Sequence, residues 1–254
     1  MRLSGVTTKH VKEVHGFIAD YLLFCDNTIS HEQTIAYLTN LKARYSQVSY
    51  NKRYFQIMKF LRYLDIPFIT KIPKAKQVIY TPQKINDDDI QQLLQEHKDD
   101  KQITSLILLG ISSGARAEEL YQLRIGDFNL EKCTIEIKQD RLHRVKNRSS
   151  IRTIFYDKAT SDVLKDYIDY YNTHKRFDRL FAQSTVTRKM KRSQTKIKML
   201  RHYFARQCTL KGIPSGVTKR FLGHSLNGDM LESHYNYLST EDLQEIYNKY
   251  FGGR

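Results

Sequence analysis

Residues 134–156 have the sequence TIEIKQDRLHRVKNRSSIRTIFY, in which two short apolar runs flank a polar loop. Residues 134–137 alternate between polar and apolar side chains, and residues 151–156 are rich in β-branched and aromatic residues, so both runs predict strands. The loop between them, residues 141–148, is cationic and contains no acidic residue. The stretch therefore predicts one antiparallel hairpin with a basic loop.

Helical patterns surround this hairpin on both sides. Asn86 is a good helix cap, and the three aspartates that follow it favour the positive end of the helix dipole. A metal site is the weaker interpretation of these aspartates, because consecutive helical residues point in different directions. The fold class predicted is mainly α-helical with one small antiparallel β-sheet. Further helices are expected at about residues 103–112, 115–123, 160–171, 194–210, 215–222 and 240–250.

Three helical patterns precede this region and predict a small helical domain over residues 1–75. The first helix spans about residues 8–25. Ser30 and Gln33 have the spacing of a capping box at the start of the second. The third ends before Pro67, because the residue that precedes a proline disfavours the α conformation.

The chain then loses its helical period between two prolines, Pro73 and Pro82. Such a segment is typical of an extended connection. We therefore predict a linker at residues 76–84 and a second domain over residues 85–254.

The composition favours an anionic partner. The 254 residues include 42 Lys and Arg against 27 Asp and Glu, which gives a formal net charge of +15. Nucleic acid is the leading candidate, because cationic side chains release condensed counterions from phosphates. A protein that is basic without binding nucleic acid is the alternative that charge alone leaves open.

Other features of the sequence exclude several classes of protein. No apolar run approaches the roughly 18 residues that a membrane span requires. The first ten residues lack the apolar stretch of a secretory signal. Three distant cysteines exclude a disulfide framework, and no phosphate-binding GxxxxGK[ST] loop or HExxH metal motif occurs. We therefore expect a protein of the reducing cytoplasm, associated with the nucleoid, that requires no metal, ATP or other cofactor.

Positive charge is concentrated in residues 179–228, which contain twelve Lys and Arg and no acidic residue. Solvated helix faces normally mix the two signs, so this one-sided segment predicts contact with a polyanion. Together with the hairpin loop it supplies the candidate DNA-binding residues: Arg144, Arg148, Arg188, Lys189, Lys191, Arg192 and Lys196.

Short motifs follow one another in a fixed order along residues 84–254. They are GARAEEL at 114–120, a lysine in the hairpin, KMLRH at 198–202, LGH at 222–224 and a tyrosine at 235. In this order the chain resembles the tyrosine recombinase (integrase) family, in a Xer-like form. Lys198 stands where the family often has histidine, which is similar to archaeal and archaeal-virus members. Residues 1–75 look like the core-binding domain of this family.

The resemblance implies a reaction in which a tyrosine hydroxyl attacks a DNA phosphate and forms a covalent intermediate. Tyr235 is the expected nucleophile, with Tyr237 as the alternative. Arg116 and Arg201 would hold the phosphate oxygens and stabilise the transition state. His224 would donate to the phosphate, and Lys198 would contact it in place of the family's histidine.

Two further residues complete the expected site. A lysine on the hairpin would protonate the leaving 5′ oxygen, and Lys146 is favoured over Lys138. Glu119 lies three residues after Arg116 and would support its guanidinium, although taken alone this spacing is more often an ordinary surface ion pair.

The resemblance also implies double-stranded DNA with a specific recombination site as partner, and a homotetramer assembled on it. It leaves open whether the task is integration and excision of a mobile element or resolution of dimers. A relaxing enzyme of the type IB topoisomerase kind and an inactive DNA-binding protein of the same fold are the alternatives. The apolar face of the last helix would dock on a neighbouring protomer or on its own domain.

Overall fold

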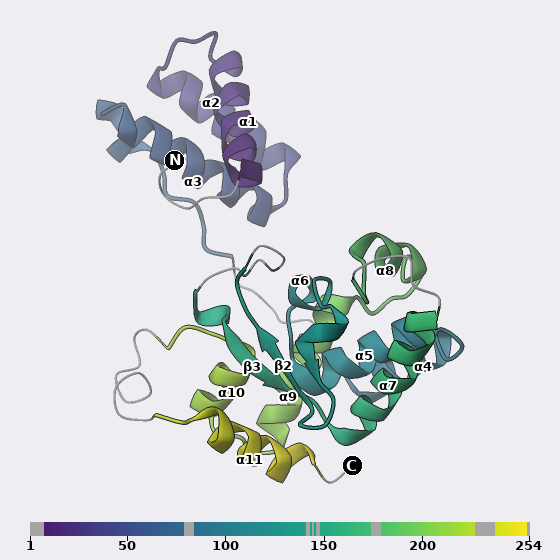
Figure 1. Cartoon of the computed structure of the whole chain (residues 1–254). Helices are drawn as coiled ribbons and strands as arrows, with labels where there is room; N and C mark the ends of the chain where they lie inside the picture. Colours follow the sequence, from purple (N-terminus) through teal and green to yellow (C-terminus); the bar gives the residue numbers. More distant parts are fainter. Residues whose placement is uncertain are drawn as a thin grey trace. The chain divides into compact units, whose positions relative to one another are not determined.

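The computed structural model describes residues 8–78, 84–140, 143, 145, 148–173, 179–226 and 237–252. The chain packs into two compact units, residues 1–82 and 83–254. Each unit has its own hydrophobic core, and the helices and strands are labelled in Figure 1.

The N-terminal unit is helical, as the sequence predicts. Its core contains Tyr21, Ile57 and Leu61, which are fully buried. The hydroxyl of Tyr21 lies 2.7 Å from Oγ1 of Thr34, so this buried polar group is satisfied. The elements are α1 (Thr8–Phe24), α2 (His31–Arg44), α3 (Gln47–Tyr63) and the 3₁₀ helix η2 (Pro67–Lys71).

At the start of α2, only half of the predicted capping box of Ser30 and Gln33 is formed. Ser30 caps the helix, since its Oγ accepts from the backbone N–H of Gln33 at 3.1 Å. The reciprocal half of the capping box is not formed, because Oε1 of Gln33 is buried without a hydrogen-bond partner among the described residues. Thr34 donates its hydroxyl to the carbonyl of Ser30 instead.

The C-terminal unit is mainly helical and contains one small sheet. The predicted helices are present, with one marked difference at residues 115–123. There α6 is a single turn, because the carboxylate of Asp127 accepts the backbone N–H of Arg124 and starts a separate 3₁₀ helix. The elements are α4 (Asp87–Glu96), α5 (Lys101–Ser113), α6 (Ala117–Leu120), η3 (Ile125–Asp127), η4 (Arg148–Ser150), α7 (Lys158–Thr173), α8 (Gln183–Lys189), α9 (Ile197–Leu210), α10 (Ser215–Leu222) and α11 (Thr240–Phe251).

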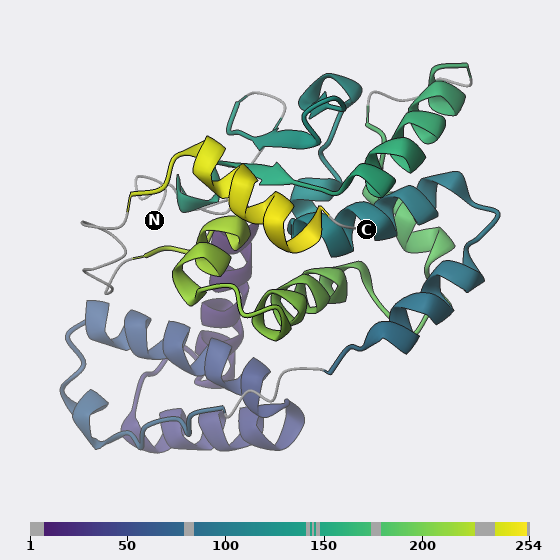
Figure 2. The same cartoon turned by 90° about the horizontal axis from the view of Figure 1, so that it is seen from below.

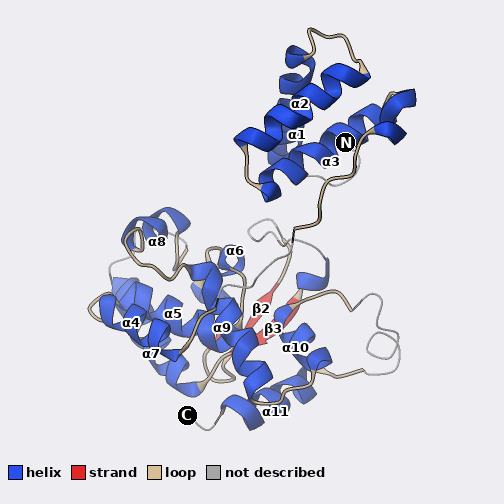
Figure 3. Ribbon diagram, turned by 180° about the vertical axis from the view of Figure 1, so that it is seen from behind, coloured by secondary structure: helices blue, strands red, loops and turns tan. Residues whose placement is uncertain are grey.

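The sheet confirms the predicted hairpin. Strand β2 (Thr134–Ile137) pairs antiparallel with β3 (Arg152–Phe155), and Ile135 lies opposite Ile154. A third strand, β1 (Phe128–Asn129), pairs with the other edge of β2. Figure 3 shows β2 and β3 as short strands among the helices of this unit.

The core of the C-terminal unit is built around α5, which packs against α7 and α9. Its apolar face includes Ile103, Leu106 and Ile107, all fully buried. Gly110 allows α9 to approach, because a Cβ at this position would lie 2.6 Å from Cδ1 of Leu200. The close contact between α5 and α9 fixes the position of Arg201, one residue after Leu200.

Helix α11 packs on its own unit, beside β3, as Figure 2 shows in yellow. Tyr247 and Phe251 are buried, and the Tyr247 hydroxyl donates to the carbonyl of Ser112 at 2.9 Å. Ser239 and Asp242 form a complete capping box at its start. In the described part of the chain, none of the helices has the length and apolar character needed to cross a membrane.

Candidate active site

The C-terminal end of α10 collects three arginine side chains from three different elements. The last carbonyls of a helix have no partner within it and carry the negative end of the helix dipole, so cations are stabilised there. In this protein three consecutive carbonyls are used in this way. Arg152 Nε donates to Phe221, Arg201 Nη2 to Leu222 and Arg116 Nη2 to Gly223, at 2.8, 2.7 and 2.9 Å.

Two glycines make this convergence possible. Gly223 ends α10 with a φ of 61°, and a Cβ there would lie 2.8 Å from Nη1 of Arg152. Gly114 ends α5 with a φ of 63°, and its carbonyl accepts from Arg201 Nη1 at 2.9 Å. A side chain at either position would strain the backbone and crowd its neighbours. Both glycines belong to motifs that the sequence analysis singled out.

Glu119 joins two of these arginines from the buried side. Its carboxylate accepts from Arg116 Nη1 at 2.7 Å and from Arg152 Nη1 and Nη2 at 3.2 and 3.1 Å. Burial alone would raise the pKa of Glu119, but Arg152 and then Arg116 outweigh it and hold the pKa below its ordinary value. The pair of Arg116 and Glu119 is therefore a buried ion pair and not the surface pair that the spacing alone favours.

Sequence reasoning missed Arg152. Its side chain is 8 % exposed, and it donates to Glu119, to Phe221 and to the carbonyl of Ser150. Burial lowers the pKa of Arg152, and the neighbouring Glu119 opposes that shift. The only signal was a single arginine within the predicted strand at residues 151–156, close to the hairpin loop.

Arg201 completes what we call the arginine cluster, Arg116, Arg152 and Arg201. Burial lowers the pKa of Arg201, and the two other arginines lower it further. A guanidinium nevertheless stays charged in proteins, so the cluster concentrates positive charge around a single carboxylate, Glu119, among the described residues. The arrangement therefore attracts an anion.

Two further predicted site residues are His224, which directly follows Gly223 in the sequence, and Lys198, which belongs to the same helix as Arg201. His224 is exposed, and its Nε2 lies 2.9 Å from Nη2 of Arg201. Because a guanidinium has no acceptor, the histidine nitrogen accepts this bond. Lys198 is exposed in the first turn of α9, three residues before Arg201, so the two share a helix face.

The remaining predicted site residues are described only in part. Tyr235, Lys146 and Arg144 lie outside the described residues, and only the backbone of Arg148 is described, at the start of η4. Of the two alternatives, Tyr237 is 85 % exposed. Lys138 pairs with Asp127 at 3.0 Å, and this contact raises the pKa of the lysine.

The expected DNA-binding residues of the charged segment lie on α8 and in the connection from α8 to α9. All five are exposed. Two have local partners, since Lys189 pairs with Asp100 at 2.7 Å and Lys196 donates to the carbonyl of Ser193. The five are Arg188, Lys189, Lys191, Arg192 and Lys196.

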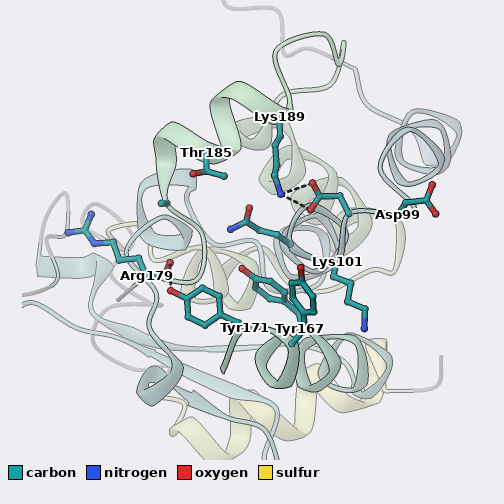
Figure 4. Close-up of a pocket in the computed structure, with 11 residues that line it drawn as sticks. Asp99, Lys101, Tyr167, Tyr171, Arg179, Thr185 and Lys189 are labelled. Atoms are coloured by element: carbon teal, nitrogen blue, oxygen red, sulfur yellow. Dashed lines mark hydrogen bonds and ion pairs between the residues drawn. The ribbon is translucent and has the colours of Figure 1, made fainter. Parts of the chain in front are cut away.

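A pocket beside α8 lies apart from the arginine cluster and shares none of its residues. Figure 4 shows Lys189 and Thr185 on one side, the rings of Tyr167 and Tyr171 on another, and Arg179 beside Tyr171. The tyrosine hydroxyls donate to main-chain carbonyls, at 2.7 Å for Tyr167 and 3.3 Å for Tyr171. These two hydroxyls therefore hold the segment before α8.

Comparison with protein families identifies the class. The model of the phage integrase family matches residues 83–241, so the chain belongs to this family, the tyrosine recombinases. The match covers the arginine cluster, both glycine caps and the hairpin. A search of curated proteins found no significant match.

Solved structures agree in fold. The Tn1549 transposon integrase in complex with circular intermediate DNA is 14 % identical with a TM-score of 0.69, covering 96 % of this chain and 94 % of that one. A lambda integrase dimer bound to a core site is 12 % identical with a TM-score of 0.67, covering 93 % of each chain. A lambda integrase tetramer bound to a Holliday junction is 12 % identical with a TM-score of 0.65, covering 92 % of this chain and 75 % of that one. At these identities the likeness establishes the fold.

Proposed function

We propose that this protein is a site-specific DNA recombinase that cleaves and rejoins DNA through a covalent 3′-phosphotyrosyl intermediate. The observation that supports this function best is the convergence of Arg116, Arg201 and His224 at the end of α10. Arg116 and Arg201 are 85 positions apart in the sequence (201 minus 116) and donate to neighbouring carbonyls. The charge they concentrate suits a phosphodiester.

The two arginines keep donors for such a ligand. A guanidinium has five N–H groups. Arg116 uses three of them, on Glu119, Ser150 and Gly223, in the described part of the structure. Arg201 also makes three such contacts. The donors left over would bind the non-bridging oxygens and stabilise the additional charge of the transition state.

Tyr235 is the proposed nucleophile, and Tyr237 remains the alternative. A tyrosine has a reference pKa of about 10 and is protonated at neutral pH. Positive charge near the phenol favours the phenolate and so assists its attack on phosphorus. Lys198 and His224 would act as donors to the phosphate, and a lysine at 198 would be a weaker proton acceptor than the histidine that the family often has.

Lys146 is the proposed general acid for the leaving 5′ oxygen. Lys138, the alternative, is held by the buried carboxylate of Asp127, which raises its pKa. A lysine that binds its proton more tightly is a poorer donor to a leaving group. The geometry at Asp127 thus favours Lys146.

The proposed substrate is double-stranded DNA with a specific recombination site. Residues 1–75 would serve as the core-binding domain, residues 76–84 as the linker and residues 85–254 as the catalytic domain, in the cytoplasm and associated with the nucleoid. The exposed cations on α8 and after it would contact the phosphate backbone, together with Arg144 and Arg148 of the hairpin.

On DNA we propose a homotetramer, as in the lambda integrase complex with a Holliday junction. In this structure α11 covers its own unit, with Tyr247 and Phe251 buried. Docking of α11 on a neighbouring protomer would therefore require release of both side chains. Truncation after Ser239 distinguishes the two arrangements, because loss of synapsis with retained cleavage indicates docking on a neighbour.

A nicked suicide duplex tests the proposed function. The recombinase should form a protein–DNA adduct at the 3′ phosphate in EDTA and without ATP, and should exchange strands between two sites. Relaxation of supercoiled DNA without strand exchange would indicate the topoisomerase alternative. Tight binding without any adduct would indicate an inactive DNA-binding protein.

A further inference from the structure

A buried histidine at the base of the hairpin has no role in the site described so far. His143 is 7 % exposed, and each of its ring nitrogens faces a carboxylate. Its Nε2 lies 2.9 Å from Oδ2 of Asp127, and its Nδ1 lies 2.9 Å from Oδ1 of Asp140. A neutral imidazole has one N–H, so only the doubly protonated ring donates to both partners at once.

The two carboxylates belong to different parts of the unit. Asp127 ends η3, and its side chain is nearly fully buried. Its carboxylate also receives the N–H of Arg124 and the ammonium of Lys138. Burial alone would raise the pKa of Asp127, but these partners hold the pKa below its ordinary value. Asp127 is therefore a fixed anion at neutral pH, tied to the region that follows α6.

Asp140 closes the base of the hairpin loop. Its carboxylate accepts the backbone N–H of His143 at 2.8 Å, and its own N–H donates to the carbonyl of His143 at 3.2 Å. Three bonds thus join these two residues, and the ring of His143 connects the turn they form to Asp127. The start of the loop is therefore attached to the body of the unit by charge-assisted bonds.

This attachment lies next to the arginine cluster. His143, Val145 and Glu119 line the same small cavity. Val145 also packs against the core. On the far side of the loop, the hydroxyl of Ser150 accepts from Arg116 Nη1 at 3.1 Å. The segment that contains Lys146 therefore lies in the sequence between two anchors, His143, which lines a cavity with Glu119, and Ser150, which is bonded to Arg116.

We propose that His143 is a positioning residue that holds the hairpin loop through Asp127 and Asp140, so that the lysine that follows it by three residues reaches the leaving oxygen. This inference rests on the proposed function. It gives the start of the loop a fixed attachment through the two ring nitrogens of His143, and it gives Asp127 a second task besides holding Lys138.

The test compares two DNA substrates in single-turnover cleavage. One has the natural 5′ oxygen at the scissile bond, and the other has a 5′ sulfur in its place. A thiolate leaves without a proton, so the sulfur substrate does not need the general acid. A merely structural defect slows both substrates equally, whereas a misplaced general acid slows only the oxygen substrate.

We expect His143→Ala to slow cleavage of the oxygen substrate about 10- to 100-fold, in line with the cost of misplacing a catalytic group by about 1 Å. Cleavage of the sulfur substrate should stay within about threefold of wild type, because its leaving group needs no proton. Asp140→Asn is the second variant, since Asp140 is 41 % exposed and its replacement preserves folding more readily. It should show the same selectivity with a smaller loss.

His97→Ala is the matched control, because His97 is bonded to Ser193 Oγ in the same unit and does not touch the hairpin. It should leave the ratio of the two rates unchanged. Equal slowing of both substrates in His143→Ala and Asp140→Asn, or no slowing in either, would overturn the inference. If the wild-type protein forms no adduct with either substrate, the proposed function itself fails.

Discussion

Replacing Glu119 by glutamine tests the energetic basis of the arginine cluster. The substitution keeps the shape of the side chain but removes the charge that faces Arg116 and Arg152 at distances of 2.7 to 3.2 Å. Breaking a buried ion pair by removing one partner costs about 3–5 kcal/mol. In a unit of this size 1 kcal/mol shifts Tm by about 2–4 °C, so we expect a loss of about 6–20 °C.

The pH dependence has a definite sign. The pKa of Glu119 is lower in the folded state than its ordinary value. Its stabilisation is therefore fully present above the unfolded pKa of roughly 4.3 and is lost as pH falls through the folded pKa. The difference in free energy of unfolding between wild type and Glu119→Gln should be constant near pH 7 and shrink in acid.

Thermal unfolding followed by circular dichroism measures this difference. The control is Glu118→Gln, which removes an exposed carboxylate from the neighbouring position of the same helix. It should change stability by no more than about 0.5 kcal/mol. If the two variants unfold at the same temperature, the carboxylate of Glu119 does not stabilise the cluster, and the reasoning is wrong.

Three other outcomes follow from the same geometry. In urea unfolding, Gly223→Ala should lower the free energy of unfolding by about 1–3 kcal/mol more than Gly212→Ala does. Both glycines have positive φ, but only at Gly223 do other atoms lie within reach of an added Cβ. Arg201→Ala should slow covalent trapping about 100- to 1000-fold in single-turnover kinetics. DNA affinity should fall by orders of magnitude between about 50 and 200 mM salt. Lys191→Ala should reduce the slope of log affinity against log salt by about one. Lys189→Ala should change this slope less, because Lys189 is already paired with an aspartate.

Local signals explain how much of the fold was predictable. The predicted cap at Asn86 is present in the structure, where Asp89 completes a capping box with it. Helices with a regular apolar period begin and end within a few residues of their predicted bounds. Two short elements, β1 and α8, were not predicted, because segments of two to seven residues carry too little periodicity to be recognised. The helix predicted at residues 115–123 is longer than the single turn of α6, because the turn formed by Asp127 is not visible in an apolar pattern.

The arginine cluster shows the limit of sequence reasoning at the site. Arg116 and Arg201 belong to motifs and were predicted, but their neighbouring acceptors at the end of α10, the carbonyls of Gly223 and Leu222, follow only from the fold. Arg152 lies outside every motif, and its burial beside Glu119 depends on how β3 meets α10. Contacts between segments that are far apart in the sequence cannot be inferred from local periodicity.

The identity of the attacking tyrosine is the most direct test of the central claim. Wild type, Tyr235→Phe and Tyr237→Phe are incubated with a nicked suicide duplex, and the adduct is digested and mapped by mass spectrometry. Phenylalanine keeps the ring and removes only the attacking oxygen. The account predicts an adduct on Tyr235 in wild type and in Tyr237→Phe, and none in Tyr235→Phe, with DNA binding nearly unchanged. An adduct that persists in Tyr235→Phe would contradict it.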